Sequence, residues 1–349
     1  MNNLDVFVLR DNVERYGELL ERAEFVTAYH TTEYLLAEEH GEEAPCRIFV
    51  YEADGQVAFM PLIQREIGHL PGLAQYAGYY DIKTPHEYSG VLMSRESEVF
   101  AAQFYRVLAK YCSEHKIIFG FFRFNPYRND NMAAQSAGYD VIKSDEQVFI
   151  DLKVSEDVNC QFAAPVRRKV RQAHNRGVIS KEVQRNKTNT QAFINLYAQS
   201  MRYLSAKKFF FFNDDYFEDL IGAQNGTRLF FSLRGEKVLS GAIMLFDKQH
   251  AYYHLGCSDV NDRKDKPVES MFAEMAKWAK EHDLEILHLG GGATSLSAFK
   301  GRFSPYRVPY YIGWNIFCPE TYKAVCKIFL LSNPEEKENS FKPLYRSKE

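Results

Sequence analysis

This 349-residue sequence lacks several features of secreted, membrane-bound and metal-binding proteins. Its six cysteines are scattered without a C-x-x-C pair, so we expect neither a zinc site nor a disulfide framework, and a reducing compartment fits best. The N-terminus has no basic segment leading into an apolar one, and no apolar run approaches the length of a membrane span. The sequence therefore predicts a cytoplasmic protein with no transmembrane segment and no metal site.

An excess of basic residues is also missing. Lys and Arg total 43 against 46 Asp and Glu, which gives a net charge of -3 and a pI of about 6.4. No overall positive field would draw the chain onto DNA, so any contact with nucleic acid needs a local basic patch. Aromatic residues, in contrast, reach 15% of the chain and can supply wide cores or ring-lined clefts. The length favours two domains.

The same order of predicted elements occurs twice. Each half begins with helical patterns, continues with a hairpin that turns at a glycine, and ends with a helix followed by an apolar strand. In the first half these elements are expected at residues 13–39, 46–63, 96–115 and 117–124. In the second half they are expected at residues 158–175, 190–204, 229–246, 268–282 and 285–289, with a further strand at 250–255.

A short segment carries this repeat at the level of residues. Residues 109–115 (AKYCSEH) align without gaps on residues 276–282 (AKWAKEH), and both segments end a helix before an apolar strand. We interpret this as a duplicated α/β unit. Each copy is predicted to form a mixed, mostly antiparallel sheet with helices on both faces, over residues 1–153 and 154–333. Residues 334–349 are expected to be a polar tail.

The central segment of the chain is residues 286–304. The run ILHLGGG at 286–292 predicts a short buried strand that stops on three glycines, which permit close backbone approaches. A lysine and an arginine then lie between two phenylalanines in FKGRF, at 299–303. Such an arrangement can hold an anionic, acyl-bearing substrate, and the plainer alternative is a strand, a tight turn and a basic surface loop.

Four segments resemble a known family. The order of helix, hairpin, strand, helix and strand, taken twice, resembles a tandem of GNAT-type acyltransferase domains, and the second half in particular resembles the FemAB group of aminoacyl (peptidyl) transferases. The matching segments are the basic helix RRKVRQAHNRGV at 167–178, the last helix and strand at 278–292, the F-K-x-x-F segment at 299–303, and the Y-x-G segment at 88–92.

The resemblance implies that an acyl group is transferred to an amine. In the FemAB branch the donor is aminoacyl-tRNA and the acceptor is a peptidoglycan precursor peptide, while the other branch uses an acyl-CoA thioester. The lysine of the F-K-x-x-F segment is Lys300, near the expected transfer centre. No permanently bound cofactor is implied, and tRNA is a possible partner.

The chemistry needs an oriented amine, stabilisation of an oxyanion and removal of one proton. Lys300 is the predicted oxyanion stabiliser, with help from Arg302, although a loop lysine can also be merely solvated. Tyr253 and His254 are the other catalytic candidates, because they lie on the strand expected to line the second cleft. A histidine on an apolar strand is more often only packed or hydrogen-bonded.

Six residues are predicted to bind substrate. Arg168 and Arg171 on the basic helix can contact phosphates, although charged runs are usually solvated helix faces. Phe299 and Arg302 flank the transfer centre, and Tyr88 and Ser89 belong to the Y-x-G segment. The four phenylalanines at 209–212 either wall an acyl pocket or lie in the core.

One departure from the GNAT pattern leaves the identity of the acyl donor undecided. GNAT enzymes cradle the CoA pyrophosphate in a glycine-rich loop, but the corresponding residues 257–266 contain no glycine. The favoured function is therefore FemAB-like transfer of an aminoacyl or acyl group to an amine of a cell-envelope precursor. The alternatives are an acyl-CoA-dependent N-acyltransferase acting on an amino sugar or small amine, and a non-catalytic protein that binds a sugar nucleotide or a peptide.

Overall fold

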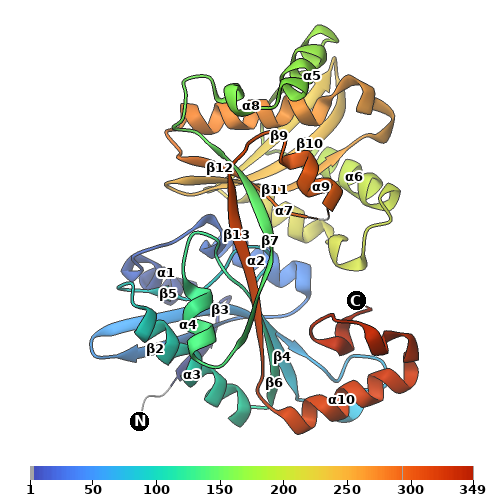
Figure 1. The fold of residues 1–349 in the computed structure, drawn as a ribbon. Helices are drawn as coiled ribbons and strands as arrows, with labels where there is room; N and C mark the ends of the chain where they lie inside the picture. The colour runs from blue at the N-terminus through green and yellow to red at the C-terminus, as the bar shows by residue number, and fades with distance from the viewer. Residues whose placement is uncertain (1–3, 293, 349) are drawn as a thin grey trace. The chain divides into compact units, whose positions relative to one another are not determined.

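The chain forms two compact units, and the computed structural model describes residues 4–292 and 294–348 (Figure 1). Unit 1 comprises Met1–Ser144 and Tyr310–Glu349, and unit 2 comprises Asp145–Pro309. The predicted division at residues 153 and 333 assigns residues 310–333 to the second domain. In the structure they pack with unit 1, because β13 (Arg307–Ile316) pairs with β6 (Ile117–Arg123).

The sheet of unit 1 is mixed and mostly antiparallel, as predicted. Its strand order is β1-β2-β3-β4-β6-β13, and only β4 and β6 pair in parallel. The helix α3 connects this parallel pair, and the two-residue strand β5 pairs with β3. The bounds are β1 (Leu4–Val8), β2 (Cys46–Ala53), β3 (Gln56–Glu66), β4 (Tyr80–Lys83), β5 (Leu92–Met93) and α3 (Glu98–Glu114).

The sheet of unit 2 has the same plan. Its order is β8-β9-β10-β11-β12-β7, and only β11 and β12 pair in parallel, again with a helix, α8, between them. Both predicted hairpins are present, as β2–β3 and β9–β10. The bounds are β7 (Asp140–Asp151), β8 (Ile179–Val183), β9 (Thr227–Arg234), β10 (Lys237–Phe246), β11 (His250–Ser258), β12 (Ile286–Gly290) and α8 (Pro267–Glu281).

The repeated sequence segment makes the same local structure in both units. His115 stacks on Tyr111 with ring centroids 3.8 Å apart, and His282 stacks on Trp278 at the same distance. In each case the histidine Nδ1 lies 2.8 Å from the carbonyl oxygen of its stacking partner. The residue after each histidine has a φ of 58°, so the helix ends in a left-handed turn.

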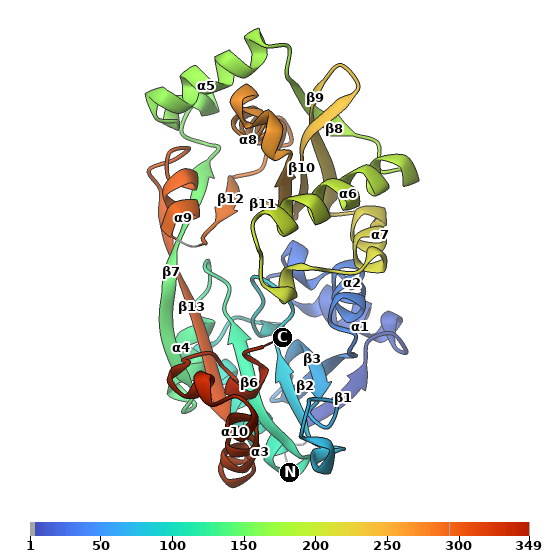
Figure 2. The ribbon, with the colours of Figure 1, turned by 90° about the vertical axis from the view of Figure 1, so that its right-hand side faces the viewer.

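Helices cover both faces of each sheet. Neighbouring residues of a strand point to opposite faces, and here apolar side chains on both faces pack against helices. In unit 2, Phe230 packs edge-on against Trp278 of α8, while Phe231 lies beside Phe193 of α6 at Gly241. Figure 2 shows α8 and α6 on opposite sides of the strands. In unit 1, Phe122 packs against α3 and Phe119 stacks on Tyr322 of α10. The remaining helices are α1 (Val13–Arg22), α2 (Thr32–Glu42), α4 (Asp130–Ser136), α5 (Ala164–Asn175), α6 (Lys187–Tyr203), α7 (Asp214–Gly222), α9 (Thr294–Lys300) and α10 (Pro319–Ser332).

The C-terminal residues are not simply a polar tail, which corrects the prediction for 334–349. Tyr345 and Arg346 are buried in unit 1. Arg346 Nε donates to Asp81 Oδ2 at 2.6 Å, and Tyr345 OH donates to the same oxygen at 3.1 Å, while Arg65 Nε donates to Oδ1 at 2.9 Å. Burial alone would raise the pKa of Asp81, but Arg346 and Arg65 outweigh it and lower that pKa.

This buried ion pair predicts that Arg346→Met destabilises the protein. Removing one partner leaves the Asp81 charge in the interior, which costs about 3–5 kcal/mol in comparable cases. Urea denaturation should therefore show a lower free energy of unfolding for the variant. The matched control is Lys348→Met, whose ion pair with Glu335 is exposed to solvent and should contribute little to the free energy of unfolding. Equal midpoints for the two variants would contradict a structural role for the C-terminal segment.

Candidate functional site

The two parallel strands of unit 2 separate after a short paired stretch. Only three residue pairs join β11 to β12, ending at Tyr252 with His288. Beyond them β11 continues to Ser258 and β12 ends at Gly290. A register shift opposite Ile243 and Met244 leaves His254 as an extra residue of β11, which is a β-bulge. The carboxyl ends of the two strands thus form a fork.

Lys300 lies at this fork. It is the last residue of α9, and only 6% of its surface is exposed. Its Nζ donates to the carbonyl oxygen of Gly291 at 2.7 Å and lies 5.5 Å from the centroid of the Tyr253 ring. The ammonium therefore contacts the residue after β12 and the aromatic face of β11 at once. The alternative of a solvated loop lysine is wrong, because the segment is a helix that turns this side chain inward.

The glycine turn brings a carboxylate to the same place. A side-chain carbon on Gly291 would overlap Asp145 Oδ2, and that oxygen lies 3.4 Å from the backbone nitrogen of Gly292. Gly292 has a φ of 132°, which favours glycine. The other oxygen, Oδ1, is buried. Asp145 is absent from the sequence-based candidates, because only the pairing of β7 with β12 brings it to the turn.

Tyr253 and His254 point in different directions. The Tyr253 ring packs edge-on against Phe272 of α8 at 4.7 Å, and burial raises the pKa of its hydroxyl. His254 is buried and its Nε2 lies 2.9 Å from the hydroxyl of Tyr216 on α7. The structure therefore brings Tyr253 together with Lys300. It gives His254 a hydrogen-bonding partner on a different helix, and a catalytic role for His254 stays a prediction.

Arg302, unlike Lys300, is exposed. Phe299 packs against Phe272 and Phe303, while the side chain of Arg302 faces solvent. The carbonyl oxygen of Arg302 accepts a hydrogen bond from Ala163 N at 2.8 Å, which ties the start of the basic helix α5 to this turn. Phosphate binding by Arg302, Arg168 and Arg171 remains a prediction.

Some cationic side chains of the basic helix α5 bind other groups within unit 2. Arg167 donates to the carbonyl oxygen of Phe162, Lys169 pairs with Glu269, and Arg176 pairs with Asp265. Arg168 and Arg171, three positions apart, are exposed and have no carboxylate within 4.0 Å in the described part of the chain. They are the two side chains of α5 that can bind an external anion.

Tyr88 and Ser89 lie in the interior of unit 1. The Tyr88 ring packs edge-on against Tyr29 and Tyr310, with centroids 5.4 Å away in both cases. Ser89 is buried and forms a parallel bridge with Phe124, next to the end of β6. These contacts hold unit 1 together. The role of Tyr88 and Ser89 in substrate binding stays a prediction.

The fork of unit 1 is bridged by backbone. Thr84, directly after β4, donates its N–H to the Phe121 carbonyl oxygen at 3.0 Å, and its Oγ1 accepts from Arg123 N at 3.0 Å. The Ser89–Phe124 bridge extends the same closure. In unit 2 the pairing of the equivalent strands ends at Tyr252 and His288, and no such bridge continues it in the described residues.

The loop before α8 is rich in carboxylates. It forms a 3-10 helix at Val260–Asp265, where a GNAT enzyme would cradle pyrophosphate. Asp262 and Asp265 are buried and pair with Arg234, and Lys237 also pairs with Asp262. Pro267 occupies the first turn of α8 and offers no N–H. This arrangement is unfavourable for a diphosphate.

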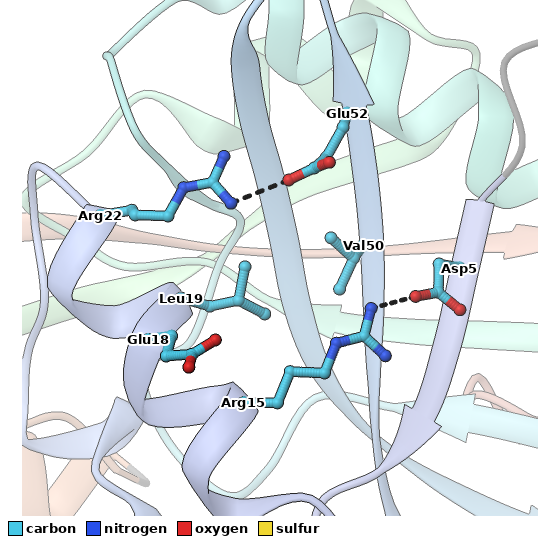
Figure 3. Close-up of a pocket in the computed structure, with 7 residues that line it drawn as sticks. All are labelled: Asp5, Arg15, Glu18, Leu19, Arg22, Val50 and Glu52. Atoms are coloured by element: carbon cyan, nitrogen blue, oxygen red, sulfur yellow. Dashed lines mark hydrogen bonds and ion pairs between the residues drawn. The ribbon is translucent and has the colours of Figure 1, made fainter.

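Two concavities lie away from the fork residues. The first, of about 230 Å³, is in unit 1 between α1, β1 and β2 (Figure 3). Its guanidinium groups are already neutralised, Arg22 by Glu52 at 2.9 Å and Arg15 by Asp5. The second, about 860 Å³, is a groove in unit 2 lined by α5, α8 and β8, and none of the predicted site residues lines it.

Two searches bear on metals and membranes. In residues 4–292 and 294–348, no three His, Cys, Asp or Glu side chains gather in a group suited to a metal ion. No helix of these residues has the length and apolarity needed to cross a bilayer.

Comparisons with known proteins agree with this geometry. Residues 161–301 match the family model described as an acetyltransferase (GNAT) domain. A search of curated protein sequences gave no match. The matched residues contain the fork, Lys300 and the basic helix. The comparisons support an acyltransferase.

Solved structures similar to the whole chain have the same fold. FemX has a TM-score of 0.65 at 14% identity, with 92% of this chain and 99% of FemX covered. A tandem GNAT protein from the clavulanic acid biosynthesis pathway has a TM-score of 0.52 at 10% identity, with 91% and 99% covered. The C-terminal domain of a putative lysylphosphatidylglycerol synthetase from Agrobacterium fabrum has a TM-score of 0.55 at 15% identity, with 86% and 92% covered. The predicted FemAB-like tandem GNAT fold is confirmed.

Proposed function

We propose that the protein transfers an aminoacyl group from an activated ester to an amine of a cell-envelope precursor. The observation that carries this proposal is the buried ammonium of Lys300 at the fork of unit 2, where it contacts both strand ends. A cation held in a sheltered site stabilises negative charge more strongly than one in water. The similarity of the fold to FemX supports the choice of reaction class.

In the proposed reaction the acceptor nitrogen attacks the ester carbonyl carbon. A C–N bond forms and the electron pair of the carbonyl moves to its oxygen, whose negative charge Lys300 stabilises. Asp145 accepts the proton that the nitrogen loses. As the C–O bond to the donor breaks, that proton passes to the departing oxygen. The products are an amide and a free hydroxyl group, and no oxidant or metal is needed.

The carboxylates before α8 favour an ester donor over acyl-CoA. A CoA pyrophosphate in the usual GNAT position would approach Asp262 and Asp265, with no glycine-rich loop to offer backbone N–H groups. Arg168, Arg171 and Arg302 can instead contact the phosphates of a tRNA end. The alternative of a CoA-dependent N-acyltransferase is supported by the description of the matched GNAT family.

Lys300→Met is expected to lower kcat by about 10²–10³-fold, the usual loss when one oxyanion donor is removed. The apolar side chain has a similar length, so the melting temperature should change little. The assay follows a radiolabelled amino acid from charged tRNA to a peptidoglycan-precursor peptide. Lys248→Met, at an exposed lysine of the same unit, is the matched control. Turnover within threefold of wild type would show that Lys300 does not stabilise the oxyanion.

Asp145→Asn should keep the shape of the glycine turn but remove the proton acceptor. We expect a loss of about 10²–10⁴-fold in kcat, as is typical of general bases. Asp140→Asn, an exposed position on the same strand, serves as the control. Turnover of Asp145→Asn within threefold of wild type would contradict a role for this carboxylate as the proton acceptor.

The donor is decided by two measurements on the wild-type protein. Calorimetry should detect no binding of CoA in the micromolar range, because residues 257–266 contain no glycine-rich loop whose backbone N–H groups could hold a diphosphate. Treatment of the charged-tRNA reaction with RNase should abolish transfer. Tight CoA binding together with RNase-resistant transfer from acetyl-CoA would replace the proposal by the CoA-dependent alternative.

A further inference from the structure

The loop between α6 and α7 exposes large apolar side chains. We call residues 202–212, the end of α6 and most of the segment that leads to α7, the aromatic–basic loop. Tyr203, Leu204, Phe209 and Phe211 expose 56%, 55%, 43% and 43% of their surface. These phenylalanines therefore neither lie in a core nor wall a closed pocket. Four such residues within nine positions are a local concentration, because exposed large apolar side chains elsewhere in the described chain are more scattered.

Contacts at both ends hold the loop in place. Phe212 stacks on Tyr216 of α7, with ring centroids 4.1 Å apart and planes 13° from parallel. At the other end, the guanidinium of Arg263 lies 4.9 Å from the centroid of the Tyr203 ring. Phe209 also packs on Phe210 at 4.1 Å. The exposed rings are thus presented from a supported segment.

The charge of the loop is entirely positive. Arg202, Lys207 and Lys208 are exposed, and residues 202–212 contain no Asp or Glu. No ion pair involves these three cations within the described residues. Exposed aromatic rings next to Lys and Arg are the chemistry of a lipid–water interface, where the rings enter the headgroup region and the cations meet anionic headgroups.

We infer that the aromatic–basic loop docks the protein on an anionic lipid surface. A second copy of the chain fits less well, because one loop of eleven residues offers too little area for the roughly 800 Å² per partner of a stable interface. Binding to a lipid surface does not need an interface of that area. A few apolar side chains can insert between the headgroups, and each Lys or Arg adds electrostatic attraction to anionic lipids. Such docking would keep the protein at the surface without a membrane-spanning helix.

The test is co-sedimentation of the full chain, without donor, with vesicles of phosphatidylglycerol and phosphatidylcholine. Wild type should bind these vesicles and bind phosphatidylcholine vesicles more weakly. The double variant Phe209→Ser/Phe211→Ser should lower the partition coefficient about tenfold or more. Lys207→Gln/Lys208→Gln should lower it about tenfold, and salt should weaken only the cation-dependent part. In Phe211→Trp, vesicles should shift the added tryptophan emission to shorter wavelength.

Leu331→Ser and Lys327→Gln, two exposed positions on α10, are the matched controls and should bind like wild type. The inference is overturned if wild type does not sediment with the anionic vesicles, or if both loop variants bind as well as wild type. A wild-type dimer in light scattering that the Phe209→Ser/Phe211→Ser variant converts to a monomer, with no vesicle binding, would assign the loop to self-association instead. None of these readouts depends on Lys300, so they stand apart from the test of transfer.

Discussion

The short parallel pairing between β11 and β12 is the constraint on which the candidate site depends. Because the strands separate after Tyr252 and His288, backbone groups and side chains near their carboxyl ends have no strand partner across the fork. The site is closed on one side by the Lys300 ammonium, which joins the Gly291 carbonyl oxygen to the face of Tyr253. The glycines after β12 are required by the same geometry, since any side chain at Gly291 would meet Asp145. The Lys300 ammonium, the Asp145 carboxylate and the separated strand ends therefore all lie where β11 stops pairing with β12.

The two units share one fold, but unit 2 is the one that places Lys300 and Asp145 beside separated strand ends. Both units share the strand order, the helix between the parallel strands and the histidine that stacks on an aromatic ring at the helix end. In unit 1, however, Thr84 joins the two parallel strands through its N–H and its side-chain hydroxyl, and Ser89 extends the closure by a backbone bridge to Phe124. Two copies of one fold thus differ at the carboxyl ends of their parallel strands, which are bridged in unit 1 and separate in unit 2. This difference involves only a few residues after each first parallel strand.

Much of the fold was accessible from the sequence, and the missed parts share a physical reason. Hairpins such as β2–β3 and the helix α8 follow local patterns of apolar periodicity and turn residues, which residues 46–63 and 267–282 carry plainly. The strand β13 and the burial of Arg346 were missed, because their partners, β6 and Asp81, lie far away in the sequence. A polar C-terminal composition cannot reveal that one arginine neutralises a buried carboxylate. Among site residues, Lys300 came from a motif, whereas Asp145 has no local signal at all.

The amino-acid sequence by itself determined the duplicated α/β plan, the mixed sheets and the lysine at the end of the FKGRF segment, because periodicity, glycine turns and repeated segments are local properties of a chain. The tertiary structure alone decided that Lys300 is buried against Tyr253, that His254 turns to Tyr216, and that Asp145 reaches the glycine turn. Those facts depend on which strands pair, in which register, and where the pairing stops. They are non-local, since a shift of one residue in a strand turns every side chain to the other face.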